Sequence, residues 1–414
     1  MTAADRAMLD RPLLTSGRRF FLLAAALVGL VVFIVGLVTD ATRAWSVLLV
    51  NFLFWSGLGH AGVAFSAIFH VTSARWARPL KRVAEATVAF LPASALMLLA
   101  LLIGLGTWAP WMHEAIGGRQ LWLNAPFLIA RQVLGFLLLG GLSVAYVYAS
   151  VRPDVGLLHE SGRSVHPAVA RRFSSGWRGL EAERRIARQR QSRLSVALLI
   201  VYGYVLSLQA FDFIMSLDRQ WFSALLGGYV FVGNLYIGVA FLGVAAVCMR
   251  TRVGLSAHDS REQLYDIGRM LLGFCMLWGY LFWSQYLVIW FGDLPEETAF
   301  VAKRTVDSPW APMSWVVLAG AFAVPFVMLL SREIKRHPAG LLTVAGVVLA
   351  SMWLERFMLV APSLWTGEHL PIGPLEVFVT AGVGALFALC YTAFLQLVPI
   401  LPIGDLLLAP DAGR

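Results

Sequence analysis

Charged residues are scarce in this chain. Asp, Glu, Lys and Arg make up 14% of its 414 residues, whereas apolar residues make up 59%. In water, a chain of this composition would expose large apolar patches. The charges that are present fall almost wholly between long apolar segments, which predicts a protein embedded in a membrane.

Cysteine is also rare. The three cysteines, Cys248, Cys275 and Cys390, lie singly inside apolar segments, with no Cys-x-x-Cys or Cys-x-x-Cys-His spacing. Such spacings hold iron–sulfur clusters, structural zinc or covalently attached haem, so we expect no metal site in this chain. The sequence also lacks the phosphate-binding Gly-x-x-x-x-Gly-Lys motif and any soluble domain large enough for a nucleotide, which argues against ATP-driven transport by this chain alone.

The apolar segments are long enough to cross a bilayer. A hydrocarbon core about 30 Å thick needs roughly 20 helical residues, and ten segments provide close to that number. We therefore predict an all-α, polytopic membrane protein with about ten transmembrane helices, in which residues 1–414 form a single integral membrane domain. The first segment is expected to be retained rather than cleaved as a signal peptide, because it is too long for a signal-peptide core. The segments begin near Phe20, Trp45, Ala86, Pro126, Leu194, Leu225, Leu264, Met313, Ala339 and Pro374.

The distribution of Lys and Arg predicts the orientation. Loops on one side hold only Arg43, Arg119, Arg219, Lys303 and Arg304, and the other side holds most of the rest. Cytoplasmic loops retain positive charge, so both termini should be cytoplasmic. The net charge of +9 then sets topology and attracts anionic membrane lipid, and it needs no nucleic acid as partner.

The longest hydrophilic stretch is a basic cytoplasmic connection, residues 152–193. Its arginines surround Trp177, Leu180 and Ile186, so it could lie as an interfacial helix. It could instead serve as a docking surface for a partner subunit. The sequence does not separate these alternatives.

Ionisable side chains inside apolar segments are costly unless they face protein or water, so each is a functional candidate. Four residues are candidates for a proton relay through bound water: Asp212, Asp266, Glu355 and Arg356. A structural alternative is that charged residues pair and lock helices together, with Arg131, Arg269 and Glu376 as candidates for such ion pairs. Both interpretations stay open at this level.

His60 lies near the middle of the second segment. Ligation of haem by two histidines would need a second histidine facing it from another helix, and none is available in the sequence. His60 is instead either a hydrogen-bonded interior histidine or, together with Asp212, a candidate contact for a quinone.

Three motifs go beyond generic membrane composition. They are residues 211–218 (FDFIMSLD) with Trp221 and Phe222, residues 285–298 (QYLVIWFGDLPEET), and residues 353–357 (WLERF). With the ten-helix count, they resemble the NrfD-like, polysulfide-reductase-type membrane subunits of alternative complex III, particularly the smaller, ActF-like paralogue. The resemblance covers all ten segments, and the Leu-Pro-Glu-Glu-Thr element is its most specific part.

The resemblance implies a membrane subunit of a quinol-oxidising respiratory complex in the bacterial cytoplasmic (inner) membrane. Its partners would be the larger NrfD-like paralogue, an iron–sulfur subunit and c-haem subunits. Those subunits would carry the iron–sulfur clusters and c-type haems, and this chain would bind no redox cofactor. The implied fold has two four-helix bundles, segments two to five and six to nine, flanked by segments one and ten.

Within that framework we favour a non-catalytic subunit that acts as a scaffold and conducts protons. One alternative is a quinone-binding catalytic membrane subunit of the same complex, with quinone or quinol as its ligand. Another is a stand-alone secondary transporter that couples through Glu355 and Arg356. The absence of Gly- or Pro-broken helices at matching positions in two halves argues against the transporter.

Overall fold

The computed structural model describes residues 13–113, 117–160, 167–218, 220–250 and 257–402, with the backbone alone for 167–170 and 257–260. Helices account for 86% of the described residues, which contain no strand. The α-helices are α2 (Ser16–Thr39), α3 (Ala41–Val71), α4 (Lys81–Glu85), α5 (Leu91–Ile103), α6 (Leu105–Trp108), α7 (Ala125–Glu160), α8 (Pro167–Ser174), α9 (Leu180–Phe213), α10 (Leu226–Met249), α11 (Ala257–Gly292), α12 (Pro295–Thr305), α13 (Ala311–Leu318), α14 (Val324–Leu330), α15 (Arg332–Arg336), α16 (Pro338–Leu364) and α17 (Pro374–Leu397).

Ten helical spans in the described residues are long and apolar enough to cross a membrane, which confirms the predicted fold class. Seven of them are single helices, and the fifth, Leu180–Leu217, is α9 followed by a 3-10 turn at Met215–Leu217. The third span, Arg75–Ile103, is composite, because a 3-10 turn at Arg75–Leu80 precedes α4 and another at Ala86–Phe90 separates α4 from α5. The eighth span, Ala311–Leu330, contains a π-helical turn at Ala319–Ala323 between α13 and α14. The protein is a multi-pass membrane protein.

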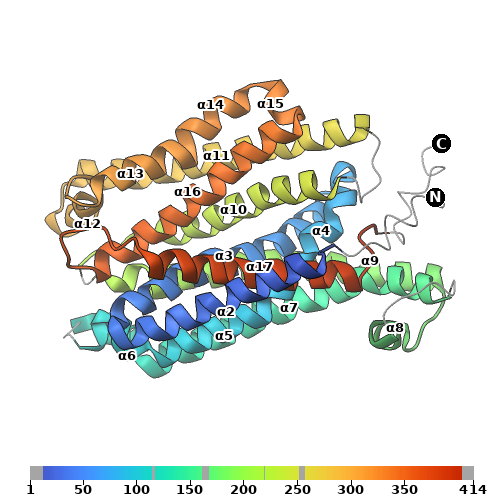
Figure 1. Ribbon diagram of the computed structural model, residues 1–414, viewed down its shortest axis with the longest axis horizontal. Coiled ribbons are helices and arrows are strands. Elements are labelled where there is room, and N and C mark those ends of the chain that lie inside the picture. Colours follow the sequence, from blue (N-terminus) through green and yellow to red (C-terminus); the bar gives the residue numbers. More distant parts are fainter. Residues whose placement is uncertain (1–12, 114–116, 161–166, 219, 251–256, 403–414) are drawn as a thin grey trace.

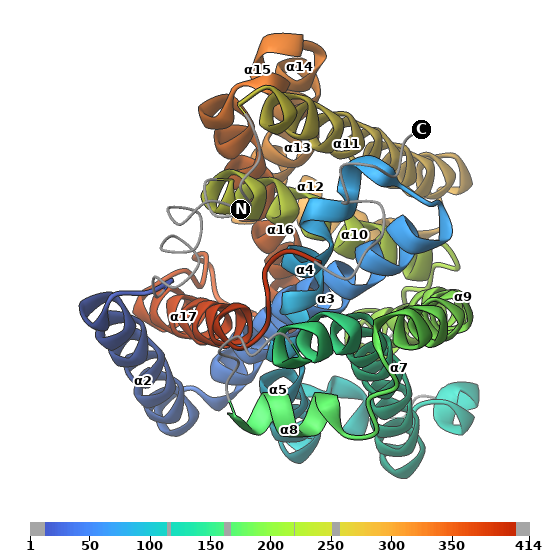
Figure 2. The same ribbon diagram turned by 90° about the vertical axis from the view of Figure 1, so that its right-hand side faces the viewer.

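The spans form two groups of four (Figure 2). One group contains α3, the third span, α7 and α9, and the other contains α10, α11, the eighth span and α16. Helix α3 lies between the groups and packs on α9, α10 and α16. In its apolar window 94% of the residues are buried, compared with 11% for α2. Helix α3 is therefore the central element of the fold, and its polar side chains face protein.

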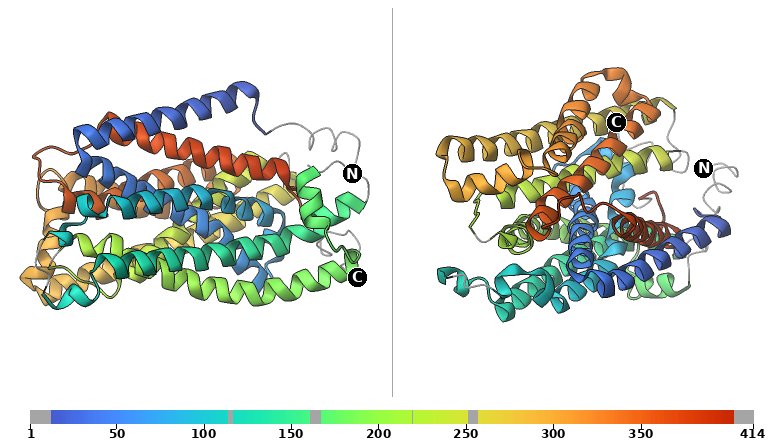
Figure 3. Two further views of the ribbon diagram at one scale, coloured as in Figure 1. Left: turned by 90° about the horizontal axis from the view of Figure 1, so that it is seen from below. Right: turned by 60° about the vertical axis from the view of Figure 1, so that its left-hand side comes forward.

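Helices α2 and α17 pack against each other outside the two groups (Figure 3). They touch where Gly29 meets Gly382, and a methyl group added at Gly29 would lie 2.8 Å from the Cα of Gly382. Small residues permit such close approach of helices in lipid, where van der Waals packing replaces the hydrophobic effect as the driving force. This pair corresponds to the two flanking segments that the resemblance implied.

The basic connection is more helical than the sequence indicated. Helix α7 continues to Glu160, and α9 begins at Leu180, 14 residues before the predicted Leu194. Arg152 donates to Glu183 over 2.8 Å and joins the two extensions, while Trp177 packs on the bare backbone of Gly156. Because the extensions bury these polar and aromatic groups against each other, they stay helical beyond the apolar segments. The short helix α8 lies at this end (Figure 1), which we call the α8 end.

The opposite end carries α12 and is called the α12 end (Figure 1). Helix α12 starts at Pro295, with Glu296 and Glu297 in its first turn. Proline is preorganised for the first helical position, and acidic side chains interact favourably with the helix amino terminus. The residue types of the Leu-Pro-Glu-Glu-Thr element are thus explained locally, because this element forms the start of α12.

Candidate functional site

Polar residues are distributed along the whole length of α3. Asn51, Ser56, His60 and Ser66 are buried on this helix, and His70 lies close to its end at Val71. At 1.5 Å per residue, the distance from Asn51 to His70 is about 29 Å, close to the thickness of the hydrocarbon core. Because lipid provides no hydrogen bonds, these groups must be satisfied by neighbouring helices or by bound water. Two charged clusters and one isolated histidine lie along this line.

The first cluster lies towards the α12 end and contains Glu355 and Arg356 from α16. Arg356 donates to Glu355 over 2.6 Å and to Oδ1 of Asn234 over 3.0 Å. Tyr229 lies beside Glu355, and Asn234 packs against Gly57 of α3. Both charged side chains are buried, yet Glu355 Oε1 and Arg356 Nε have no protein partner. Glu355 therefore keeps one carboxylate oxygen available to a water molecule or a proton.

Asp212 lies in a separate site where all its partners come from the protein. Arg131 forms a bidentate pair with it, at 2.7 Å and 2.6 Å, and Gln132 and Trp122 donate to the same carboxylate at 2.5 Å and 3.1 Å. The Arg131 guanidinium also lies 4.2 Å from the Trp122 ring centroid. Four donated hydrogen bonds approach the accepting capacity of a carboxylate. This geometry favours a lock between α7 and α9 over a proton carrier.

His60 is 1% exposed and lies between the charged clusters along α3. Its ring packs edge-on against Phe136, with the centroids 5.6 Å apart, and neither ring nitrogen has a protein partner. Buried polar groups without protein partners are usually hydrogen-bonded to buried water. His60 is about 4.5 Å along the helix axis from Gly57 and about 9 Å from Ser66, since the rise is about 1.5 Å per residue. Neither of the two cavities described in this structure is lined by His60.

The second charged cluster lies towards the α8 end and is absent from the sequence-based candidates. Arg82 donates to Glu85 over 2.5 Å and also binds Asp154 of α7. Ser66 of α3 donates to the other Glu85 oxygen over 2.9 Å, and Tyr146 donates to the Ser66 carbonyl over 2.9 Å. All five side chains are buried. The cluster therefore links three spans at one level of the protein.

The cluster joins two carboxylates to one guanidinium. Arg82 forms ion pairs with both Glu85 and Asp154. Asp154 also lines a cavity with Lys and Arg side chains, which supply further positive charge beside the cluster.

Sequence reasoning missed these residues because of where the segments were divided. The third segment was started at Ala86, one residue after Glu85, and Asp154 was assigned to the basic connection. The signal was present, since Arg82 and Glu85 are three residues apart and directly precede an apolar run.

The remaining predicted residues lie apart from α3. Asp266 and Arg269 approach each other at 3.6 Å on α11, with side chains 31% and 65% exposed. Glu376 is buried at the start of α17 and accepts two hydrogen bonds of 2.7 Å from Arg43 of α3. Glu376 also accepts a hydrogen bond from the backbone N–H of Gly373. The Arg43–Glu376 pair therefore fixes the start of α17 relative to α3.

The motif residues assemble at the α12 end. Trp221 stacks on Phe300 of α12, with ring centroids 3.7 Å apart, and Asp218 accepts from the backbone N–H of Trp221. Arg304 of α12 is buried and donates to the carbonyls of Met358 and Leu359, near the end of α16. Of the motif residues, Trp221 therefore holds α12 in place, and Arg304, which lies outside the motifs, joins α12 to α16.

A scan against protein-family models finds no match, and a search of curated proteins finds no related sequence. Among the described residues there is also no group of three or more His, Cys, Asp or Glu side chains placed to hold a metal ion. The class of protein rests on the fold, a ten-span helical membrane protein with charged clusters buried along its central helix.

Proposed function

We propose that this chain is a membrane subunit of a quinol-oxidising respiratory complex, in which it acts as scaffold and conducts protons. The proposal places it in the bacterial cytoplasmic membrane, with the α8 end and both termini on the cytoplasmic side. Its partners are a larger paralogous membrane subunit, an iron–sulfur subunit and c-haem subunits, which carry the redox centres. The motif resemblance and the two groups of four spans support this choice of complex.

The observation that carries the proton-conducting role is the line of buried polar groups along α3. Glu85 and Asp154 lie near one end, Glu355 lies towards the other, and His60 lies between them. Water molecules bound at the unpartnered atoms of His60 and Glu355 would complete hydrogen-bonded connections between the clusters.

We assign different roles to the candidate residues. Glu355, Glu85 and Asp154 exchange protons, and Arg356 and Arg82 hold these carboxylates in place. Asp212 with Arg131, and Glu376 with Arg43, hold helices together. Asp266 and Arg269 are partly exposed on α11 and have no place in the relay proposed here.

A purification tests membership of the complex. The tagged chain, extracted in mild detergent, is expected to copurify with iron–sulfur and c-haem subunits and to show c-haem absorbance. A chain that migrates alone without haem would overturn the proposal and favour a stand-alone transporter. A stand-alone transporter would be expected to have broken helices at matching positions in the two groups of spans. The third span is the second member of its group, whereas the eighth span is the third member of the other group. Their departures from α-helical geometry therefore do not form a matched pair.

Proton stoichiometry tests the relay within the purified complex. In proteoliposomes, Glu85→Gln and Glu355→Gln should each lower the number of protons moved per electron while quinol oxidation continues. Glu262→Gln is the matched control, because Glu262 is 49% exposed and pairs with Arg336 at the surface. Unchanged stoichiometry in both buried variants would leave the clusters with a purely structural role.

A further inference from the structure

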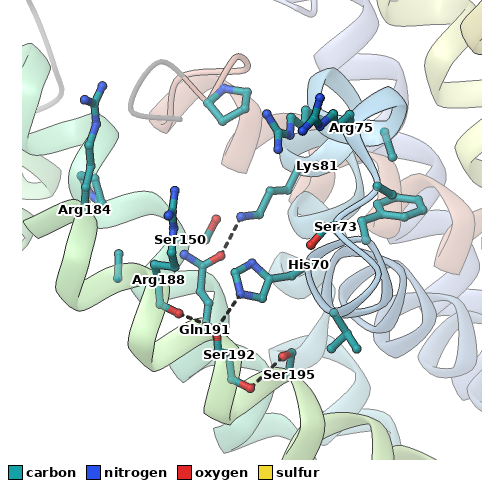
Figure 4. Close-up of a pocket in the computed structure, with 18 of the residues that line it drawn as sticks. His70, Ser73, Arg75, Lys81, Ser150, Arg184, Arg188, Gln191, Ser192 and Ser195 are labelled. Atoms are coloured by element: carbon teal, nitrogen blue, oxygen red, sulfur yellow. Dashed lines mark hydrogen bonds between the residues drawn. The ribbon is translucent and has the colours of Figure 1, made fainter. Parts of the chain in front are cut away.

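A large cavity opens at the α8 end, beside the Arg82–Glu85–Asp154 cluster. Its volume is about 620 Å³, and it lies between the end of α3, the segment from Ser73 to Lys81, α7 and α9 (Figure 4). Asp154 lines it and is already bound to Arg82. Nothing in the proton route described above uses the remainder of this cavity.

The lining is strongly basic. Five Lys or Arg side chains and a single carboxylate, that of Asp154, contribute to it. Two of the cations come from α9, and three come from the segment that follows α3, so they approach from two sides (Figure 4). The basic residues are Arg75, Arg78, Lys81, Arg184 and Arg188.

The polar groups of the cavity are held in place by bonds between its walls. Lys81 donates to Gln191 of α9 over 2.6 Å, and His70 of α3 lies 3.2 Å from Ser192 (Figure 4). Arg184 pairs with Glu181, but its buried Nε has no partner among the described residues. The cavity therefore presents preorganised cationic and hydrogen-bonding groups, which suit a phosphate oxyanion.

The cavity also has an apolar edge. Val71 of α3 and Val196 of α9 line it, and each is 49% exposed. One and two turns further along α9, Ile200 and Tyr204 are 69% and 67% exposed. Residues spaced by four lie on one face of a helix, so this stripe continues from the cavity along a surface that faces lipid. A ligand that fits both the basic cavity and the apolar stripe has an anionic head and an apolar tail.

We propose that this cavity binds the headgroup of an anionic phospholipid, with its acyl chains along the exposed stripe of α9. Basic pockets between transmembrane helices are known to suit such headgroups, and the attraction is worth about a fivefold change in affinity for each nearby cation. The phosphate is bound by the Arg and Lys side chains, and the bound lipid joins α9 to the segment after α3. This inference does not depend on the proposed respiratory function.

The test uses the full chain, purified and delipidated in detergent, and titrated with phosphatidylglycerol. Bound lipid is counted by native mass spectrometry, and Tm is measured in parallel. The variant Arg184→Gln/Arg188→Gln should bind roughly 30-fold more weakly, which is about fivefold for each of the two cations removed. The matched control is Arg185→Gln/Arg190→Gln, which removes the same charge from exposed positions of α9 outside the cavity.

The expected result is that the native chain and the control bind phosphatidylglycerol and gain Tm alike, whereas the cavity variant needs roughly 30-fold more lipid for the same occupancy and the same gain in Tm. Arg184→Lys/Arg188→Lys should retain most of the binding, which separates loss of charge from loss of fold. Two further probes distinguish the source of the phosphate. Equal binding of phosphatidylcholine, or an equal rise in Tm with inorganic phosphate alone, would overturn the anionic-lipid assignment, as would equal loss in the control.

Discussion

The Arg131–Asp212 pair allows the lock and relay roles of a buried carboxylate to be separated by experiment. Arg131→Gln removes the cation and leaves Asp212, which is fully buried, with Gln132 and Trp122 as its remaining donors. Asp212→Asn removes the anion and leaves Arg131, whose side chain is 8% exposed. The double variant removes both charges and keeps amide groups that can hydrogen-bond.

The magnitudes follow from the burial of the pair. Leaving one member of a buried ion pair without its partner costs about 3–5 kcal/mol. Because two donors to Asp212 remain, the loss of stability in Arg131→Gln should lie near the lower end of this range. Loss of the cation–π contact between Arg131 and the Trp122 ring, at 4.2 Å, adds about 0.5–1 kcal/mol. We expect a loss of about 3–4 kcal/mol for Arg131→Gln. The double variant should lose about 1–2 kcal/mol, because no buried charge is left alone.

Denaturant unfolding of the purified protein in detergent measures these free energies, and proton stoichiometry in the complex measures coupling. A lock predicts a stability coupling of at least about 2 kcal/mol between the two positions, because the double variant loses about 1–2 kcal/mol whereas Arg131→Gln alone loses about 3–4 kcal/mol. It also predicts unchanged protons per electron in Asp212→Asn. The reasoning would be refuted if Arg131→Gln cost less than about 1 kcal/mol, or if Asp212→Asn abolished proton movement in protein that remained folded.

Other contacts make equally direct predictions. Gly29→Leu should separate α2 from α17, because a single added methyl group already meets Gly382, and crosslinking between cysteines placed on the two helices should fall. Arg304→Leu should release α12 from the end of α16, which limited proteolysis of the α12 segment should detect, whereas Lys303→Leu should leave the cleavage pattern unchanged.

The sequence predicted the parts of the fold that follow from burial in a lipid bilayer. The ten spans follow from segment length, and the grouping into two fours with two flanking segments follows from the resemblance. The packing of the first span against the last was not predicted. Helix ends were less predictable, because apolar length does not indicate where a helix stops. The extensions of α7 and α9 are stabilised by contacts such as Arg152 with Glu183, which join residues 31 positions apart.

The polar sites were predicted only where a charge interrupts an apolar run. Glu355, Arg356, Asp212 and its partner Arg131 were found in this way, but the uncharged partners Asn234 and Gln132 were not. Glu85 and Asp154 stand at the edges of apolar runs, where a charge usually marks the water interface. The spacing of Arg82 and Glu85 indicates that these two side chains are neighbours, but their burial depends on tertiary packing, which no pattern within one segment shows.

The central position of α3 has a consequence for biosynthesis. Two of the helices that surround it, α10 and α16, are translated some 155 and 267 residues after its last residue, Val71. Until they arrive, its histidine, asparagine and serines face lipid or the insertion machinery. Nascent chains that end before α16 should therefore be preferred substrates for membrane quality-control proteases, and the chain should gain resistance to them only when the ninth span has been inserted.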